Sequence, residues 1–197
     1  MSDRTSTPVT AAAATAIPWR SIARWMVTFA AFPLGSLAAR LLVGSVDAPV
    51  PALLGGLLNG VVLGIAQAWA VRDVRLPAVP WAGATATGFA TGLVLGAAVV
   101  GYATDARSLV VQGAVTGGAV GLAQATVLGR SGLRPLTLLW PVLLAGAWAL
   151  GWAITTAVGV EVGLRFTVFG SSGAVVVAAL TLLLPVTLRR ASKQVRS

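Results

Sequence analysis

The chain has 197 residues, of which 57% are hydrophobic and only 10% are charged, with a mean hydropathy of +0.89 and a formal net charge of +9. So few charges cannot cover the surface of a water-soluble domain of this size, and the composition indicates a protein whose solvent is lipid. The chain contains no cysteine and no histidine, which excludes disulfides, a thiolate nucleophile and the commonest metal ligand, and we expect no cofactor.

Six apolar runs follow one another along the chain, each near the roughly 20 residues that cross a bilayer core. They cover residues 22–43, 52–71, 80–102, 108–129, 136–158 and 165–188. Backbone in lipid must satisfy its own hydrogen bonds, so each run is expected to be a helix. The sequence therefore predicts an all-α, six-helix transmembrane bundle over residues 19–189. A disordered cytoplasmic tail at 1–18 precedes the bundle, and a basic cytoplasmic tail at 190–197 follows it.

Positive charges are concentrated in alternate connections between these runs. If the N-terminus is cytoplasmic, eleven Lys and Arg residues lie on the cytoplasmic side and three, at Arg40, Arg107 and Arg165, lie on the other. Short cytoplasmic loops carry the excess of Lys and Arg. We therefore expect a multi-pass protein of the bacterial cytoplasmic (inner) membrane with both termini in the cytoplasm. Since no basic patch with interleaved aromatic residues occurs, we expect no nucleic-acid partner.

Two of the runs contain the same motif of small residues. The segment GLLNGVVLGIAQ (56–67) returns 57 positions later as GAVTGGAVGLAQ (113–124), and GSSGAVVVAALT (170–181) is a degenerate third copy. Residues spaced four apart share one helix face, where small side chains let a neighbouring helix approach closely. The expected helix-packing residues are Gly56, Gly60, Gly64, Gly113, Gly117, Gly121, Gly170, Ala174 and Ala178.

The runs also alternate in a way that predicts an internal repeat. A tryptophan stands near the start of each odd-numbered run, at Trp25, Trp81 and Trp140. The bundle is accordingly expected to consist of three two-helix hairpins of about 57 residues, at about 20–75, 76–132 and 133–189. The small-residue stripes are expected to converge on a shared centre, packing against one another or against the odd-numbered helices. A pseudo-threefold bundle and a linear array of hairpins both satisfy this pattern.

One polar residue continues each stripe beyond its last small residue, at Gln67, Gln124 and Thr181. Such side chains avoid lipid, so they either form a polar constriction or ligand ring, or clasp the helices together by hydrogen bonds, which is the interpretation we favour. Asn59 and Thr116 occupy equivalent positions and are expected to bond a backbone carbonyl one turn away. Trp148 and Trp152 lie four residues apart and are expected to pack in the core, with a pigment, quinone or lipid contact as the alternative.

The glycine motif ending in Gln, followed by a basic turn and a Trp-led run, resembles a broad group of uncharacterised bacterial polytopic membrane proteins with glycine-zipper hairpin repeats. The matching stretches are Gly60–Gln67 with Arg72 and Trp81, and Gly117–Gln124 with Arg130 and Trp140. The third hairpin departs from the motif, since it has alanines for glycines and Thr181 for Gln. The resemblance implies a bacterial multi-span membrane protein and brings no established activity.

The apolar runs place no Asp, Glu, Lys or His at mid-membrane depth, where ion-coupled transporters usually keep such a group. The leading hypothesis is a non-enzymatic membrane protein that acts through packing with itself as a homo-oligomer, with the lipid bilayer, or with a partner membrane protein. The alternative is a passive channel or uncoupled transporter for a small neutral or amphipathic solute, built on the polar layer. A third hypothesis is a lipid-processing enzyme, for which Asp73 between Arg72 and Arg75 is the cytoplasmic candidate.

Overall fold

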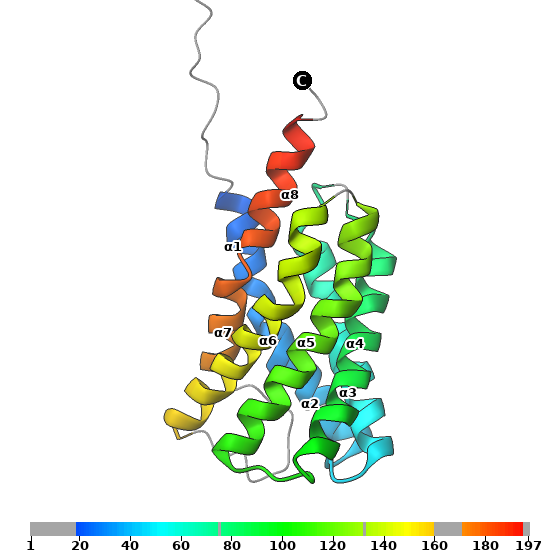
Figure 1. The fold of residues 1–197 in the computed structure, drawn as a ribbon, viewed down its shortest axis with the longest axis vertical. Coiled ribbons are helices and arrows are strands. Elements are labelled where there is room, and N and C mark those ends of the chain that lie inside the picture. Colours follow the sequence, from blue (N-terminus) through cyan, green and yellow to red (C-terminus); the bar gives the residue numbers. More distant parts are fainter. Residues whose placement is uncertain (1–18, 75, 132, 160–170, 195–197) are drawn as a thin grey trace, which may run out of the picture.

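The computed structural model describes residues 19–74, 76–131, 133–159 and 171–194. In these residues all regular secondary structure is helical (Figure 1). The elements are α1 (Trp19–Val27), η1 (Thr28–Ala30), α2 (Ala31–Val43), α3 (Pro49–Ala70), α4 (Ala78–Val99), α5 (Ala106–Arg130), α6 (Arg134–Ala157), α7 (Ser171–Leu180) and α8 (Leu183–Gln194). The predicted tail at 1–18, Gly170 and the last residues of the C-terminal tail lie outside the described residues.

Within the described residues, six helical segments are long and apolar enough to cross a membrane, which confirms the predicted all-α fold class. They are Trp19–Val43, Pro49–Ala70, Ala78–Val99, Ala106–Arg130, Leu136–Ala157 and Ser172–Arg189, numbered below as the first to sixth spans. The chain is thus a multi-span α-helical membrane protein.

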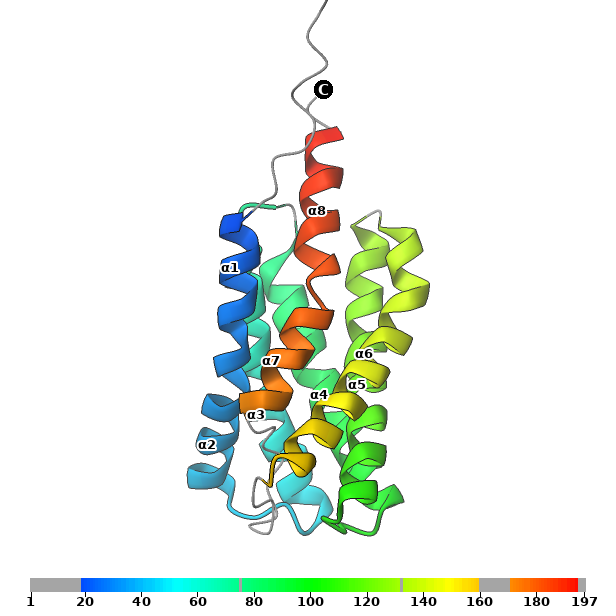
Figure 2. The same cartoon turned by 90° about the vertical axis from the view of Figure 1, so that its left-hand side faces the viewer.

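The spans form a closed ring, in which each packs beside the next one in the chain. The sixth span returns to the first, because α7 contacts η1 and α8 contacts α1. Figure 2 shows α7 and α8 between α1 on one side and α6 on the other. A linear array of hairpins, which the sequence left open, would not bring the two ends of the chain together in this way.

Two spans are interrupted near a proline. In the first span, η1 separates α1 from α2, and Pro33 has no N–H to offer the carbonyl of Phe29. In the sixth span, α7 ends at Leu180, and Pro185 has no N–H for the carbonyl of Thr181, which accepts the Leu184 N–H at 3.1 Å instead. Because these two spans are neighbours, both interruptions lie at the contact that closes the ring.

The two ends of the bundle differ in charge. The start of α1, the α3–α4 and α5–α6 connections and α8 lie at one end (Figure 1). We call it the basic end, because Arg20, Arg24, Arg72 and Arg189 lie there. At the opposite end, α2 stops at Gly44, whose φ of 91° favours glycine. There Asp105 caps the start of α5, because its side chain accepts the Ser108 N–H at 3.1 Å.

Candidate functional site

The glycine stripe of α3 lies directly against the backbone of α4. A Cβ atom built on Gly56, Gly60 or Gly64 would lie 2.6–2.8 Å from the Cα atom of an alanine of α4, closer than real Cβ atoms approach. No side chain larger than hydrogen fits there without a shift of one helix. These glycines therefore set the distance between the second and third spans.

The stripe of α5 packs in the same way against α6. A Cβ atom on Gly121 would lie 2.5 Å from the Cα of Pro141, and one on Gly117 would meet the carbonyl of Leu144 and the ring of Trp148. The two glycine stripes thus pack against the following odd-numbered span. This is one of the two arrangements that the sequence left open.

The third stripe is placed less tightly. Ala174 and Ala178 of α7 are buried, whereas Gly170 lies outside the described residues. Gly173 of α7 lies close to α6, because a Cβ atom there would meet the carbonyl of Gly151 and the hydroxyl of Thr155. Gly173 lies beside the predicted stripe rather than on it.

A further stripe, on α4, was missed in the sequence. A Cβ atom on Gly88 or Gly92 would lie 2.7 Å from a Cα atom of α5, and one on Gly96 would lie 3.0 Å from the carbonyl of Gln112. The signal was present, because GFATGLVLG (88–96) repeats the spacing of four. The third span therefore packs closely on both of its neighbours, through its own glycines on one side and those of α3 on the other.

The polar layer joins each predicted residue to a tryptophan of another span. Trp81 Nε1 donates to Gln67 Oε1 at 3.1 Å, Trp140 Nε1 to Gln124 Oε1 at 2.7 Å, and Trp25 Nε1 to Thr181 Oγ1 at 3.0 Å. In every pair the acceptor is on an even-numbered span and the donor on the odd-numbered span beside it. The tryptophans that the sequence marked as hairpin starts are therefore the hydrogen-bond donors of this layer.

Gln124 links the layer across the bundle. Its Nε2 donates to Thr85 Oγ1 at 2.8 Å and to Gln67 Oε1 at 3.1 Å, and its side chain is buried. The two glutamines thus bond each other. Thr181 instead forms a separate pair with Trp25 and donates its own proton to the carbonyl of Val177. This geometry is that of a hydrogen-bond clasp between helices.

An aromatic cluster fills the bundle seven or eight residues along the odd-numbered spans from these tryptophans. The rings of Phe32 and Trp148 meet edge to face with centroids 5.4 Å apart, and those of Phe89 and Trp148 at 5.0 Å. All three side chains are buried. The cluster joins the first, third and fifth spans, and the separation of 57 residues between Phe32 and Phe89 was a usable signal.

Of the two other polar residues on the stripes, one has the expected partner. Thr116 Oγ1 donates to the carbonyl of Gln112, one turn away, at 2.8 Å. Asn59 Nδ2 instead donates to Ser36 Oγ of the first span at 2.8 Å. The expectation of a local backbone partner was wrong for Asn59, because the amide is long enough to reach the neighbouring helix.

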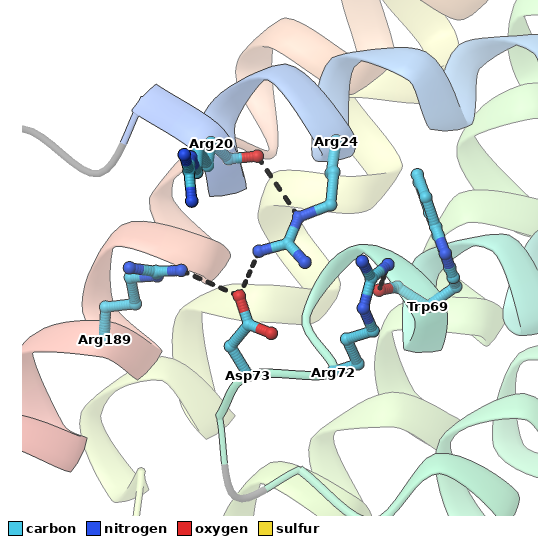
Figure 3. A network of polar contacts seen from close by, with 6 residues as sticks. All are labelled: Arg20, Arg24, Trp69, Arg72, Asp73 and Arg189. Carbon is cyan, nitrogen blue, oxygen red and sulfur yellow. Dashed lines mark hydrogen bonds and ion pairs between the residues drawn. The ribbon is translucent and has the colours of Figure 1, made fainter.

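A carboxylate ties three segments together at the basic end. Asp73, in the α3–α4 connection, pairs with Arg24 of α1 and, at 3.0 Å, with Arg189 of α8 (Figure 3). The hydrogen bond from Arg24 lowers the pKa of Asp73 below its ordinary value of 3.8, and the charges of Arg24, Arg189 and Arg72 act in the same direction. Asp73 is therefore ionised at neutral pH, where it serves as an ion-pair anchor and has no proton to donate.

Comparisons of the chain with protein-family models, with curated proteins and with solved structures find no match. A function for the chain must therefore be inferred from its own residues and their contacts.

Proposed function

We propose that this chain is a non-enzymatic multi-span protein of the bacterial cytoplasmic membrane, with both termini in the cytoplasm. It acts through the surface that its closed bundle presents to lipid, to a partner membrane protein or to a second copy. The observation that carries the proposal is the packed centre, where side chains of the polar layer hydrogen-bond one another and the rings of the aromatic cluster meet. In the described residues the amide of Gln124 is buried and fully hydrogen-bonded, and the aromatic cluster is buried and apolar.

The centre is occupied at two depths. In the polar layer, the Gln124 oxygen accepts from Trp140 and its nitrogen donates to Thr85 and Gln67, so the amide is satisfied without water. Further along, the rings of the aromatic cluster meet across the bundle. A channel or uncoupled transporter would need polar groups that face water along its length.

The outer surface is apolar, as a lipid-facing surface must be. Large aliphatic side chains are widely exposed on several spans; examples are Leu41 (74%), Val79 (83%), Leu138 (82%) and Val142 (73%). In water such a surface would drive aggregation, whereas in a bilayer it is the ordinary solvent boundary. The excess of Arg and Lys at the basic end supports its assignment to the cytoplasmic side.

The hydrogen-bond pairs support the threefold repeat as well. Residues 57 apart, Gln67, Gln124 and Thr181, accept from the tryptophans of the third, fifth and first spans in turn. The last pair closes the cycle by returning to the start of the chain. This order of partners favours a threefold repeat that forms a ring over one that forms a row.

The absence of cysteine from the chain allows a direct test of the closed centre. Thr85→Cys and Thr116→Cys place thiols at two buried positions with little change in side-chain size. Ser131→Cys at the basic end and Ala103→Cys at the opposite end are the matched controls. Each variant is treated with a membrane-impermeant maleimide in intact spheroplasts and in inverted vesicles.

We expect both buried thiols to stay unlabelled from either side until the membrane is dissolved in denaturing detergent. Ser131→Cys should react only in inverted vesicles and Ala103→Cys only in spheroplasts. Labelling of the buried thiols in native membranes would refute the closed centre and favour the channel or uncoupled transporter. Labelling of Ser131→Cys from outside the cell would refute the assigned orientation.

A further inference from the structure

We propose that the bundle carries a specific site for an anionic phospholipid of the leaflet at the basic end. One acyl chain lies in a groove between the first and second spans, and Arg20 and Arg72 bind the phosphate. The proposal rests on the proposed function only in placing the bundle in a membrane with this end in the cytoplasm.

The groove is apolar and opens outward between two spans. It has a volume of about 530 Å³, within the range of small-molecule sites, and is lined by five residues from Val27 to Leu34 and four from Val62 to Trp69. Thr28 brings the one hydroxyl among these described lining residues, and that group already donates to the carbonyl of Trp25 at 2.6 Å. The groove therefore offers an occupant apolar contact without competing hydrogen bonds.

The interruption of the first span contributes to the groove. The lining includes Thr28 and Ala30 of η1, with Ala66 across from them on α3. Small side chains leave space here. The larger side chains of Val27, Ile65 and Trp69, which are all exposed, lie on either side of it. A flexible hydrocarbon chain suits such a furrow, because it has no polar group to desolvate and already surrounds the protein at this depth.

Both walls of the groove lead to an arginine at the basic end. On α3, Val62, Ile65 and Trp69 recur at helical spacing, and Arg72 follows one turn later with its Cζ 4.9 Å from the centroid of the Trp69 ring (Figure 3). On α1, Arg20 and Arg24 precede Val27 on the same face. A lipid with its chain in the groove would thus place its phosphate among guanidinium groups.

The arginine cluster at the basic end carries a net positive charge, which favours an anionic ligand. The cluster in Figure 3 holds four guanidinium groups, on Arg20, Arg24, Arg72 and Arg189, against the one carboxylate of Asp73. The ion pairs of Asp73 go to Arg24 and Arg189. Arg20 and Arg72 are exposed, and Arg72 also donates to the carbonyl of Trp69 at 3.4 Å. The net positive charge favours an anionic headgroup over a zwitterionic one.

The test is lipid titration of the full-length protein in detergent, followed by native mass spectrometry. Phosphatidylglycerol is compared with phosphatidylcholine of the same acyl chains and with inorganic phosphate. Arg20→Gln and Arg72→Gln remove the headgroup contacts, Arg72→Lys keeps the charge, and Ala66→Phe or the smaller Ala66→Leu fills the groove. Arg130→Gln, exposed at the end of α5, and Ala179→Phe, exposed on α7, are matched controls away from the groove. Far-UV circular dichroism and size-exclusion chromatography check that each variant is folded.

We expect one saturable phosphatidylglycerol site that free phosphate does not occupy. Its affinity should fall about fivefold for each guanidinium removed, and Arg72→Lys should keep most of the preference over phosphatidylcholine. Filling the groove should weaken binding of both lipids, and the controls should bind as the unchanged protein does. Equal affinity for the two lipids, or equal losses in Arg72→Gln and Arg130→Gln, would overturn the proposal. Either result leaves the thiol-labelling experiment on the closed centre unaffected, because the groove lies on the outside of the bundle.

Discussion

The close approach of α3 and α4 predicts that one added methyl group at Gly60 destabilises the bundle. In Gly60→Ala, the new Cβ would lie 2.6 Å from the Cα of Ala86, 2.9 Å from the Cβ of Phe89 and 3.0 Å from the carbonyl oxygen of Thr85. Two of these atoms are backbone, so relief requires the helices to separate rather than a side chain to rotate.

Gly55 provides a matched control five residues earlier on the same helix. A Cβ atom there would lie 3.6 Å from a methyl group of Val46 and 3.7 Å from the Cβ of Ala39, which is ordinary van der Waals contact. Both substitutions gain similar helix propensity, up to about 1 kcal/mol. The difference between them isolates the overpacking term of about 1–3 kcal/mol, which should make Gly60→Ala the less stable variant.

The measurement is unfolding in detergent micelles, by heat or by titration with denaturing detergent, with far-UV circular dichroism and tryptophan fluorescence as probes. For chains of this size each kcal/mol corresponds to about 2–4 °C in Tm. We expect Gly55→Ala to unfold at or slightly above the Tm of the unchanged protein and Gly60→Ala several degrees below it. Equal Tm values for the two variants would refute the inference that Gly60 sets the helix separation.

Three further predictions concern the centre and the basic end. Trp140→Phe removes one bond to Gln124, and the same unfolding assay should show a loss of about 0.6–2 kcal/mol that is not additive with Gln124→Leu. Phe89→Ala should lower the free energy of unfolding by about 3–5 kcal/mol, because it leaves a cavity beside Trp148. Asp73→Asn should lower it by about 1 kcal/mol at neutral pH, since the carboxylate that forms both ion pairs is 45% exposed. Because the folded pKa of Asp73 is lowered, its contribution is complete above the ordinary value of 3.8 and is lost as the pH falls through the folded pKa, so the Tm values of the two proteins should converge in acid.

The spans could be predicted from the sequence because a single physical constraint determines them. A segment that crosses lipid must be apolar over about 20 residues, and this property is local to each run. The presence and approximate positions of the six helices therefore followed from hydropathy alone. The interruptions at η1 and after α7 did not, although Pro33 and Pro185 stand four residues beyond the carbonyl groups that they leave without a helical partner.

Partners between helices were harder to predict, because they depend on which faces meet. The spacing of four showed that Gly60 and Gly117 face another helix, but it did not show which one. It also did not show that Thr85 completes the polar layer, since Thr85 lies outside the repeated motif. Asp73 was noted only as a possible enzymatic residue, because its partners Arg24 and Arg189 lie 49 and 116 positions away.

The contact between the first and sixth spans, which closes the ring, differs from the contacts between the other neighbouring spans. There the acceptor is the Thr181 hydroxyl rather than a glutamine, and both of the spans are interrupted. Trp25 donates to Thr181, its carbonyl accepts from Thr28, and Thr28 lines the proposed lipid groove. The ion pairs of Asp73 bind the same two spans, through Arg24 and Arg189. An occupant of the groove therefore contacts η1 at the point where the first span holds the sixth, so lipid binding and the strength of this contact should change together in the variants described above.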